Sequence, residues 1–325
     1  MVILDLVGGL AALAEGDTLT LPVRDDELAV VNLWCDRTGN SVASYGGGLV
    51  VVRRGRAPDP LRGVAPDRRP GVRLWMYTNF DCNLACDYCC VRSSPSTPRR
   101  ALGRDVVQRL ALEAPTAGVQ QLLLTGGEPF LLPDIADLVN ACADSLPTTL
   151  LTNGMLFHGR RLERLREMDR RVALQISLDS ATPDLHDSHR GEGSWARAVT
   201  GVRTAIQMGF RVRVAATLVT PDVAEEKQLR NLLDGLGIAV EDQVLRPLAK
   251  RGEATDGLVL SQATLQPEVT VTADGVYWHP VGADDADQLV TTEAFPLVDA
   301  IAAVRDRYVG YRRQADDVAR TFVCA

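Results

Sequence analysis

Between residues 71 and 252, short apolar runs alternate with longer amphipathic segments, and no other feature of the sequence constrains the fold as strongly. The runs have the length and side chains of strands, whereas the intervening segments repeat apolar residues at helical spacing. Six strands are predicted, over 72–77, 120–124, 148–151, 172–178, 212–218 and 243–248. Helices are predicted over 104–113, 131–143, 194–208 and 224–236. Right-handed crossovers make such strands parallel, so we expect an α/β fold, a partial TIM-like (β/α)6 barrel with functional residues following its strands.

Regions of different character flank this predicted barrel. Strand-like runs over 18–22, 28–34 and 48–52 predict a small β-rich N-terminal domain, residues 1–55. Four prolines in residues 56–70 disfavour both helix and central strand, so this stretch is expected to be a linker. Beyond the barrel domain, 71–252, residues 253–325 predict a small α+β cap. It contains a hairpin over 269–279, with Asp274-Gly275 at its turn, and a helix near 296–308.

The charge balance limits the classes of partner. A net charge of −7 argues against a mainly electrostatic nucleic-acid binder, so small molecules or peptides are the expected partners. No run approaches the roughly 20 apolar residues of a membrane span, and no basic region precedes the N-terminal apolar stretch, so cytoplasmic location is the default expectation. Four of the seven cysteines lie between Cys82 and Cys90, a pattern typical of metal-binding thiolates in a reducing compartment.

Three of these cysteines, Cys82, Cys86 and Cys89, follow the first barrel strand on one short loop. Three thiolates leave one iron of an iron–sulfur cube open to an external ligand, whereas four normally make a closed centre. Half of a zinc site is the alternative. Zinc usually takes paired Cys-x-x-Cys units that supply four ligands, and no matching second pair lies nearby.

A second motif, Gly126-Gly127-Glu128-Pro129, follows the second strand. Its glycines allow a backbone to approach a ligand closely, and its carboxylate can accept hydrogen bonds from an ammonium group, although alone such a string is merely a turn. Together, the cysteine spacing, Tyr88 before the third cysteine and this motif resemble the radical S-adenosylmethionine (SAM) enzymes. The resemblance implies one [4Fe–4S] cluster on the three cysteines, with the amino and carboxylate groups of SAM on the fourth iron and the glycine-rich motif at its amino group.

Further matches resemble the subgroup that carries a SPASM or Twitch extension. Asn153 ends the third strand, Ser177 the fourth, and Arg190 lies shortly after. This resemblance implies that Ser177 and Arg190 contact SAM and that Leu218 and Val219, ending strand five, line its adenine. The plainer alternative for each is a polar residue that ends a strand or caps a helix. His186 and His189 could be a metal pair, but solvated or capping histidines are commoner.

Substrate residues are predicted from charge and position. The candidates are Asp179, Arg246, Lys250 and Arg251. The three basic residues follow strand six and could bind an acidic substrate group, although a solvated basic loop is an equal alternative. Cys90 and Cys324 are candidate hydrogen-atom donors, and a buried structural thiol is the plainer interpretation of Cys90.

The chain departs from the subgroup where auxiliary clusters would bind. Trp278-His279-Pro280 stands where the subgroup has a cysteine, and only Cys324 lies downstream of Cys142. We therefore expect a cap without a cluster, and redox-neutral chemistry such as epimerisation, decarboxylation, elimination or addition. The expected enzyme takes an electron from a flavodoxin- or ferredoxin-type donor and acts on a sugar, nucleoside or amino-acid unit. The alternatives are a ribosomally made peptide substrate, docked on the N-terminal region, and a non-catalytic SAM- or cluster-binding protein.

Overall fold

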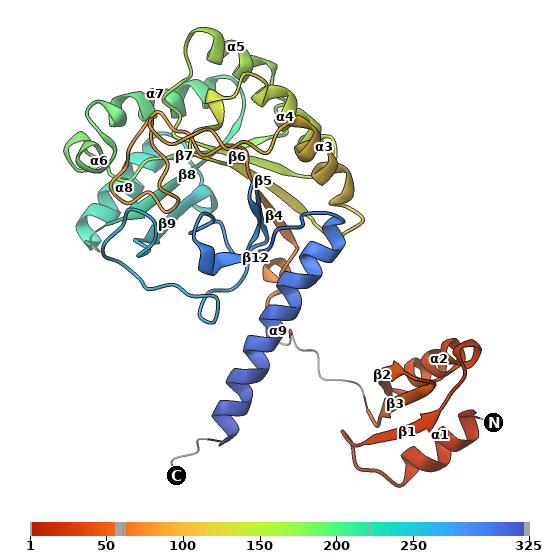
Figure 1. The fold of residues 1–325 in the computed structure, drawn as a ribbon. Coiled ribbons are helices and arrows are strands. Elements are labelled where there is room, and N and C mark those ends of the chain that lie inside the picture. Colours follow the sequence, from red (N-terminus) through yellow and green to blue (C-terminus); the bar gives the residue numbers. More distant parts are fainter. Residues whose placement is uncertain (1, 56–60, 62, 220–221, 322–325) are drawn as a thin grey trace. The chain divides into compact units, whose positions relative to one another are not determined.

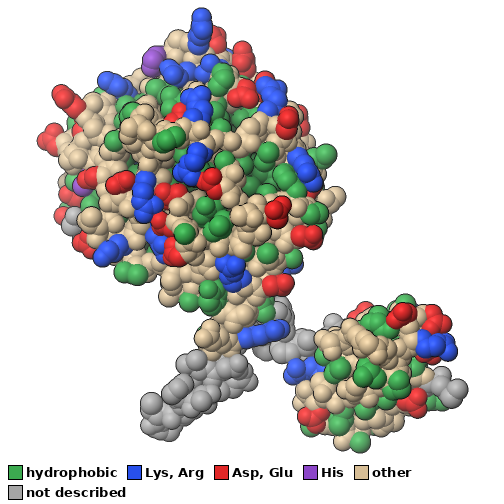
Figure 2. Space-filling view, in the orientation of Figure 1, with side chains coloured by type: hydrophobic (Ala, Val, Ile, Leu, Met, Phe, Trp, Pro, Cys, Tyr) green, Lys and Arg blue, Asp and Glu red, His purple; other side chains and the backbone are tan. Residues whose placement is uncertain are grey.

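The computed structural model describes residues 2–55, 61, 63–219 and 222–321, and the chain divides into two compact units, Met1–Gly63 and Val64–Ala325 (Figure 1). Each unit has its own buried apolar core. No helix within the described ranges is long and apolar enough to cross a membrane. On the face that Figure 2 shows, acidic and basic side chains are interspersed with apolar ones over the larger unit.

The N-terminal unit is an α+β fold, which corrects the β-rich prediction. Helix α1 (Val2–Ala11) precedes β1 (Thr18–Pro22), and α2 (Leu28–Thr38) precedes β2 (Ser41–Gly46) and β3 (Leu49–Arg53). The three strands form an antiparallel sheet in the order β1-β3-β2. The predicted strands over 18–22 and 48–52 are confirmed.

The predicted strand over 28–34 is wrong, because these residues open helix α2. Its buried side chains, Val31 and Cys35, lie four residues apart, which is the spacing of one helical face. The helix ends at Gly39, whose φ of 75° suits a residue without a side chain. The periodicity of a short apolar run does not distinguish a strand from a helix. Here the helix forms because its buried face covers the small sheet.

The larger unit contains the predicted barrel. Its six strands are adjacent and parallel in chain order, and each begins and ends within one residue of the predicted bounds. They are β4 (Arg73–Tyr77), β5 (Gln121–Thr125), β6 (Thr148–Thr152), β7 (Ala173–Ser177), β8 (Arg211–Leu218) and β9 (Gln243–Pro247). Figure 1 shows the helices along the outer side of this sheet. The partial-barrel prediction is confirmed.

The helices of the barrel follow their strands. They are α3 (Arg104–Glu113), α4 (Ile135–Ala143), α5 (Gly159–Glu167), α6 (Pro183–Arg190), α7 (Ser194–Gln207) and α8 (Val223–Gly235). The predictions for α3, α7 and α8 are confirmed to within one residue. Helix α4 begins four residues late because Leu132, which precedes a proline, is extended. Two short helices, α5 and α6, were not predicted.

Side chains alternate between the two faces of the barrel sheet. Leu74 and Met76 of β4 belong to the core beneath the helices, so Trp75 and Tyr77 face the barrel interior. Paired residues of neighbouring strands share a face, and the pairs Ser177 with Ala215 and Thr217 with Arg246 continue the interior face. The interior is therefore lined by polar as well as apolar side chains.

The C-terminal region extends the barrel sheet. Strand β10 (Thr270–Thr272) pairs in parallel with β4, and β11 (Gly275–Tyr277) and β12 (Leu289–Thr291) follow antiparallel, so nine strands form one sheet. The predicted hairpin is confirmed, although its turn is Ala273-Asp274. Helix α9 (Leu297–Thr321) runs well beyond the predicted 296–308. Trp278 is fully buried beside Tyr308 and Tyr311 of this helix.

Candidate functional site

The cysteine loop follows β4 at the C-terminal end of the barrel strands. Cys82 is buried, Cys86 and Cys89 are half-buried, and all three are free thiols. Backbone N–H groups donate to two of the sulfurs, from Leu84 to Cys82 at 3.4 Å and from Ser93 to Cys89 at 3.2 Å. Hydrogen bonds of this kind stabilise cluster-bound thiolates.

These thiols fit an iron–sulfur cube better than a single metal ion. Within the described ranges, no three His, Cys, Asp or Glu side chains are placed to hold one ion. In a cube, each thiolate binds a different iron, so the sulfurs need not converge on one point. Burial raises the pKa of Cys82 to about 12 and that of Cys86 to about 11, so binding a metal requires both thiols to lose a proton.

The Gly126-Gly127 backbone lies directly against the cysteine loop. The N–H of Gly127 donates to Asn79 O at 2.9 Å, and the N–H of Glu128 donates to Asp81 O at 3.0 Å. A Cβ at Gly127 would lie 2.2 Å from Asp81 O, and one at Gly126 would lie 2.5 Å from Asn79 Oδ1. The glycines therefore permit close approach of the chain's own cysteine loop, which the sequence did not reveal.

The Glu128 carboxylate is buried and bonded within the protein. It accepts hydrogen bonds from Phe130 N at 3.0 Å, Thr152 Oγ1 at 2.8 Å and Asn153 N at 2.8 Å. Burial raises its pKa, although these three donors oppose that shift. The carboxylate joins the ends of β5 and β6, and the predicted contact of this motif with the amino group of SAM stays a prediction. Asn153 in turn donates to Asn83 Oδ1 of the cysteine loop at 2.8 Å.

We expect Gly127→Ala to destabilise the larger unit by about 1–3 kcal/mol, because the added methyl group overlaps backbone that cannot move freely. Urea unfolding measures the change. Gly235→Ala is the matched control, since nothing lies within 4 Å of its Cβ position in helix α8. That change should be neutral or stabilise by up to ~1 kcal/mol. Equal midpoints for the two variants would contradict the close-approach interpretation.

Asp179 and Arg190 form a buried ion pair beside the cysteine loop. Their side chains are only 5% and 10% exposed, and Arg190 Nε lies 2.5 Å from Asp179 Oδ2. The N–H of Thr217 donates to Asp179 Oδ1 at 2.9 Å, and the Tyr88 hydroxyl donates to Oδ2. Burial opposes ionisation of Asp179, but the Arg190 guanidinium outweighs it and holds the pKa of Asp179 below its usual value.

This network changes the role expected of Asp179. Both its oxygens are already bonded to Arg190, Tyr88 and Thr217, so the geometry favours a positioning role over the predicted substrate contact. Through this network Tyr88, which precedes the third cysteine, is connected to Asp179 after β7 and to Thr217 at the end of β8.

The end of helix α6 holds the other side of the cysteine loop. His189 Nδ1 lies 2.9 Å from Asp87 Oδ2, and the N–H of Asp87 donates to His189 O at 3.2 Å. His186 Nδ1 accepts from Asp179 N at 3.2 Å, and burial lowers the pKa of His186 to about 4. The two histidines thus have separate structural roles. Asp87 was not predicted as a functional residue, although its place next to Cys86 puts a carboxylate on the cysteine loop.

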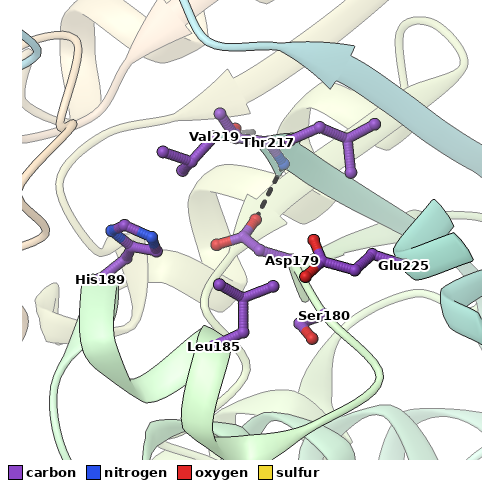
Figure 3. A pocket seen from close by; sticks show the side chains of 8 residues that line it. Asp179, Ser180, Leu185, His189, Thr217, Val219 and Glu225 are labelled. Carbon is purple, nitrogen blue, oxygen red and sulfur yellow. Dashed lines mark hydrogen bonds between the residues drawn. The ribbon is translucent and has the colours of Figure 1, made fainter. Parts of the chain in front are cut away.

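A small pocket lies between the ends of β7 and β8 (Figure 3). Leu218 and Val219, predicted to line the adenine, both line it. Leu185 from α6 and Glu225 from α8 complete its walls, as Figure 3 shows, and neither was predicted. Ser177 ends β7 nearby, and no hydrogen bond to its hydroxyl is present among the described residues.

The predicted substrate residues separate into different environments. Arg251 pairs with Asp285 at 3.1 Å and Asp287 at 2.8 Å, so its guanidinium is already engaged. Lys250 is exposed beyond β9. Arg246 lies on β9 itself and faces the barrel interior.

The two candidate hydrogen donors also differ. Cys90 packs in an apolar cluster with Tyr77, Phe80 and Val91, and burial raises its pKa to about 12, so it is a thiol at neutral pH. This setting favours the structural interpretation, and its donor role stays a prediction. Cys324 lies outside the described residues.

The residues that build this site lie in the part of the chain that is similar to known proteins. Residues 76–234, about half of the chain, match the family model of the Radical SAM superfamily. Similar curated proteins include the AdoMet-dependent heme synthase of Methanosarcina barkeri (28% identical, 59% of this chain, 55% of that protein) and the subtilosin biosynthesis protein AlbA of Bacillus subtilis (31%, 48%, 35%). The mycofactocin maturase MftC of Mycobacterium tuberculosis is 31% identical over 58% of this chain and 47% of its own length. The chain spans about half or less of these relatives.

Among solved structures, SuiB of Streptococcus suis bound to S-adenosylmethionine matches with a TM-score of 0.51 and 21% identity, over 60% of this chain and 45% of that one. This likeness supports the partial-barrel fold. The cofactors of the family are a [4Fe–4S] cluster and SAM. With its cysteine loop and Gly-Gly-Glu-Pro motif inside the matched residues, this chain belongs to the radical SAM superfamily.

Proposed function

We propose that this chain is a radical SAM enzyme in which Cys82, Cys86 and Cys89 hold one [4Fe–4S] cluster. The observation that carries the proposal is that three free thiols share one loop, which is held in place from two sides. The Gly126–Glu128 backbone bonds to one end of the loop, and the Asp179–Arg190 pair and His189 bond to the other. Such support holds a reactive centre in a fixed geometry.

The cofactors supply the difficult chemistry. Reduced by an external one-electron donor of the flavodoxin or ferredoxin type, a cluster held by the three cysteines would break the C5′–S bond of SAM, releasing methionine and a 5′-deoxyadenosyl radical that would take a hydrogen atom from a substrate C–H bond. Ser177, Asn153, Gly126 and Pro129 lie at the strand ends nearest the loop and are the proposed SAM contacts. The SAM roles of Gly127, Glu128, Tyr88 and Arg190 are indirect in this proposal: they position the loop and the contacts.

An apolar cluster shields one side of the cysteine loop. Tyr77 and Phe80 stack with ring centroids 5.3 Å apart, and Val91, Tyr277 and Ala283 pack with them. Water is therefore excluded from this side, which protects a radical from side reactions.

The proposed substrate is a small polar metabolite bound in the barrel interior. Polar side chains such as Thr149, Gln175 and Thr217 face that interior. In the given sequence, the cysteines outside the loop form no second triad, so we propose a single cluster and a redox-neutral outcome.

A peptide is the second candidate substrate, and the N-terminal unit favours it. In that unit's sheet, β1 and β2 each pair with β3 on one side only. An extended peptide can add to such an edge by backbone hydrogen bonds. The solved structure of SuiB bound to precursor peptide SuiA, a fold neighbour, shows a protein of this fold with a peptide.

The deciding experiment is anaerobic reconstitution with iron and sulfide, followed by chemical reduction and assay for 5′-deoxyadenosine. We expect about four irons per chain and SAM cleavage that depends on the reductant. A fully loaded cluster without SAM cleavage would instead support the non-catalytic alternative. About eight irons per chain would overturn the single-cluster proposal.

A further inference from the structure

Arg246 lies on β9, the last strand of the barrel. It pairs in register with Thr217 on the interior face of β8, while its neighbour Leu245 packs against the core beneath the helices. Strand β9 is one end of the nine-stranded sheet. The segment after β9 returns to the cysteine loop, where the N–H of Glu253 donates to Cys89 O at 2.9 Å.

The other interior arginines of the barrel are paired. Arg73 lies 3.4 Å from a Glu268 carboxylate oxygen, and Arg213 lies 3.4 Å from Asp242 Oδ1. By contrast, the Arg246 guanidinium forms no hydrogen bond or ion pair with any residue that the structure describes. It is a solvent-exposed cation without an ion-pair partner among the described residues, on the face where substrate is expected.

A neutral hydrogen-bond donor lies within electrostatic reach of this guanidinium, from the opposite end of the sheet. His279 follows β11, and its Nδ1 accepts from Val281 N at 3.1 Å, which assigns the ring proton to Nε2. Burial lowers the pKa of His279 to about 3, and Arg246 and Arg73 add to that shift. The same Arg246 charge acts on Cys90 and Tyr77. The charge of Arg246, on the end strand β9, therefore acts on residues of the cysteine loop and on His279.

One acidic side chain near Cys90, that of Asp284, is paired through one of its oxygens. Asp284 acts electrostatically on Cys90, as Arg246 does, but its Oδ2 lies 2.9 Å from Arg92. No carboxylate of the described residues pairs with Arg246, so its charge is available to a partner from outside the chain. A guanidinium offers two parallel N–H donors, which match the oxygens of a carboxylate or a phosphate.

We propose that Arg246 binds an anionic group of the substrate, a carboxylate or a phosphate, beside the cysteine loop. The inference rests on the proposed function in taking the barrel interior as the substrate site. It narrows the substrate class to acidic metabolites or acidic ends of larger molecules.

Arginine-specific labelling tests the site on the reconstituted full-length protein. Phenylglyoxal is added with and without succinate or inorganic phosphate at millimolar concentration, and labelled peptides are quantified by mass spectrometry. We expect one of the two anions to slow labelling of Arg246 by about fivefold or more, as occupancy of a charge-assisted site requires. Protection by succinate identifies a carboxylate site, and protection by phosphate identifies a phosphate site.

Arg203 is the matched control, because it is exposed on helix α7. Its labelling should be unaffected by either anion. Equal protection of both arginines, or protection of neither, would overturn the proposal. An Arg203→Gln variant should leave the protection of Arg246 and SAM cleavage unchanged.

The labelling experiment and the SAM-cleavage assay test the anion site and the enzyme proposal independently. If wild-type protein does not cleave SAM but Arg246 is protected, the enzyme proposal fails and the anion site stands. If SAM is cleaved but no anion protects Arg246, the enzyme proposal stands and the anion site fails.

Discussion

A Cys86→Ser variant should lose its cluster and reduce 5′-deoxyadenosine formation by at least a hundredfold. Removing one of three thiolates leaves the cube with two protein ligands, and a serine oxygen is a poor substitute for a soft sulfur ligand. Iron content and visible absorbance after anaerobic reconstitution measure the first effect. The nucleoside assay under a chemical reductant measures the second.

Cys90→Ser is the matched control for iron content. Cys90 lies in the same loop but packs among Tyr77, Phe80 and Val91, outside the predicted ligand set. Its variant should retain about four irons per chain. Loss of iron from Cys90→Ser, together with retention in Cys86→Ser, would mean that the ligands had been assigned incorrectly.

Asp179→Ala is expected to destabilise the larger unit by about 3–5 kcal/mol, because it leaves the buried Arg190 guanidinium without its counter-ion. The variant should also weaken the hold on Tyr88 and hence on the cysteine loop. The shift of the urea midpoint measures the loss of stability. Intrinsic fluorescence of the full chain can follow the transition.

The control is Asp144→Ala, which removes an exposed partner of Arg171. Exposed pairs contribute about 0–1 kcal/mol, so this midpoint should move little. The buried-pair argument fails if the two variants unfold at the same urea concentration. Asp179→Asn adds an intermediate case, since it keeps the shape of the side chain while removing its charge.

The barrel was predictable because its strands are buried on both faces. In a run such as Leu122-Leu123-Leu124, successive side chains face the helix layer and the barrel interior in turn, and both are apolar. A continuous apolar run therefore indicates such a strand. The N-terminal unit lacked this signal. Its helix α2 was predicted as a strand because the mostly apolar run 28–34 fits both periods, and only the packing of Val31 and Cys35 on the small sheet decides between them.

The candidate site was predictable in its residue types but less so in their contacts. Glu128 and Asp179 were expected to contact ligands, yet in the structure both buried carboxylates accept hydrogen bonds from residues of the chain itself. A buried charge needs a partner, and the partners here come from strands far apart in sequence. Arg246 and Arg251 lie five residues apart and look alike in sequence, but only Arg251 meets carboxylates from the C-terminal region.

By itself, the sequence determined the family, the barrel strands and the three cysteine ligands proposed for the cluster, because periodicity and fixed spacing are local properties of the chain. The tertiary structure decided the rest. It showed that Gly127 permits contact between two loops, that Asp179 neutralises Arg190, and that no described residue pairs with Arg246. Each of these depends on which charged groups and backbone segments come into contact after folding. The distance between two residues along the sequence does not predict such contacts.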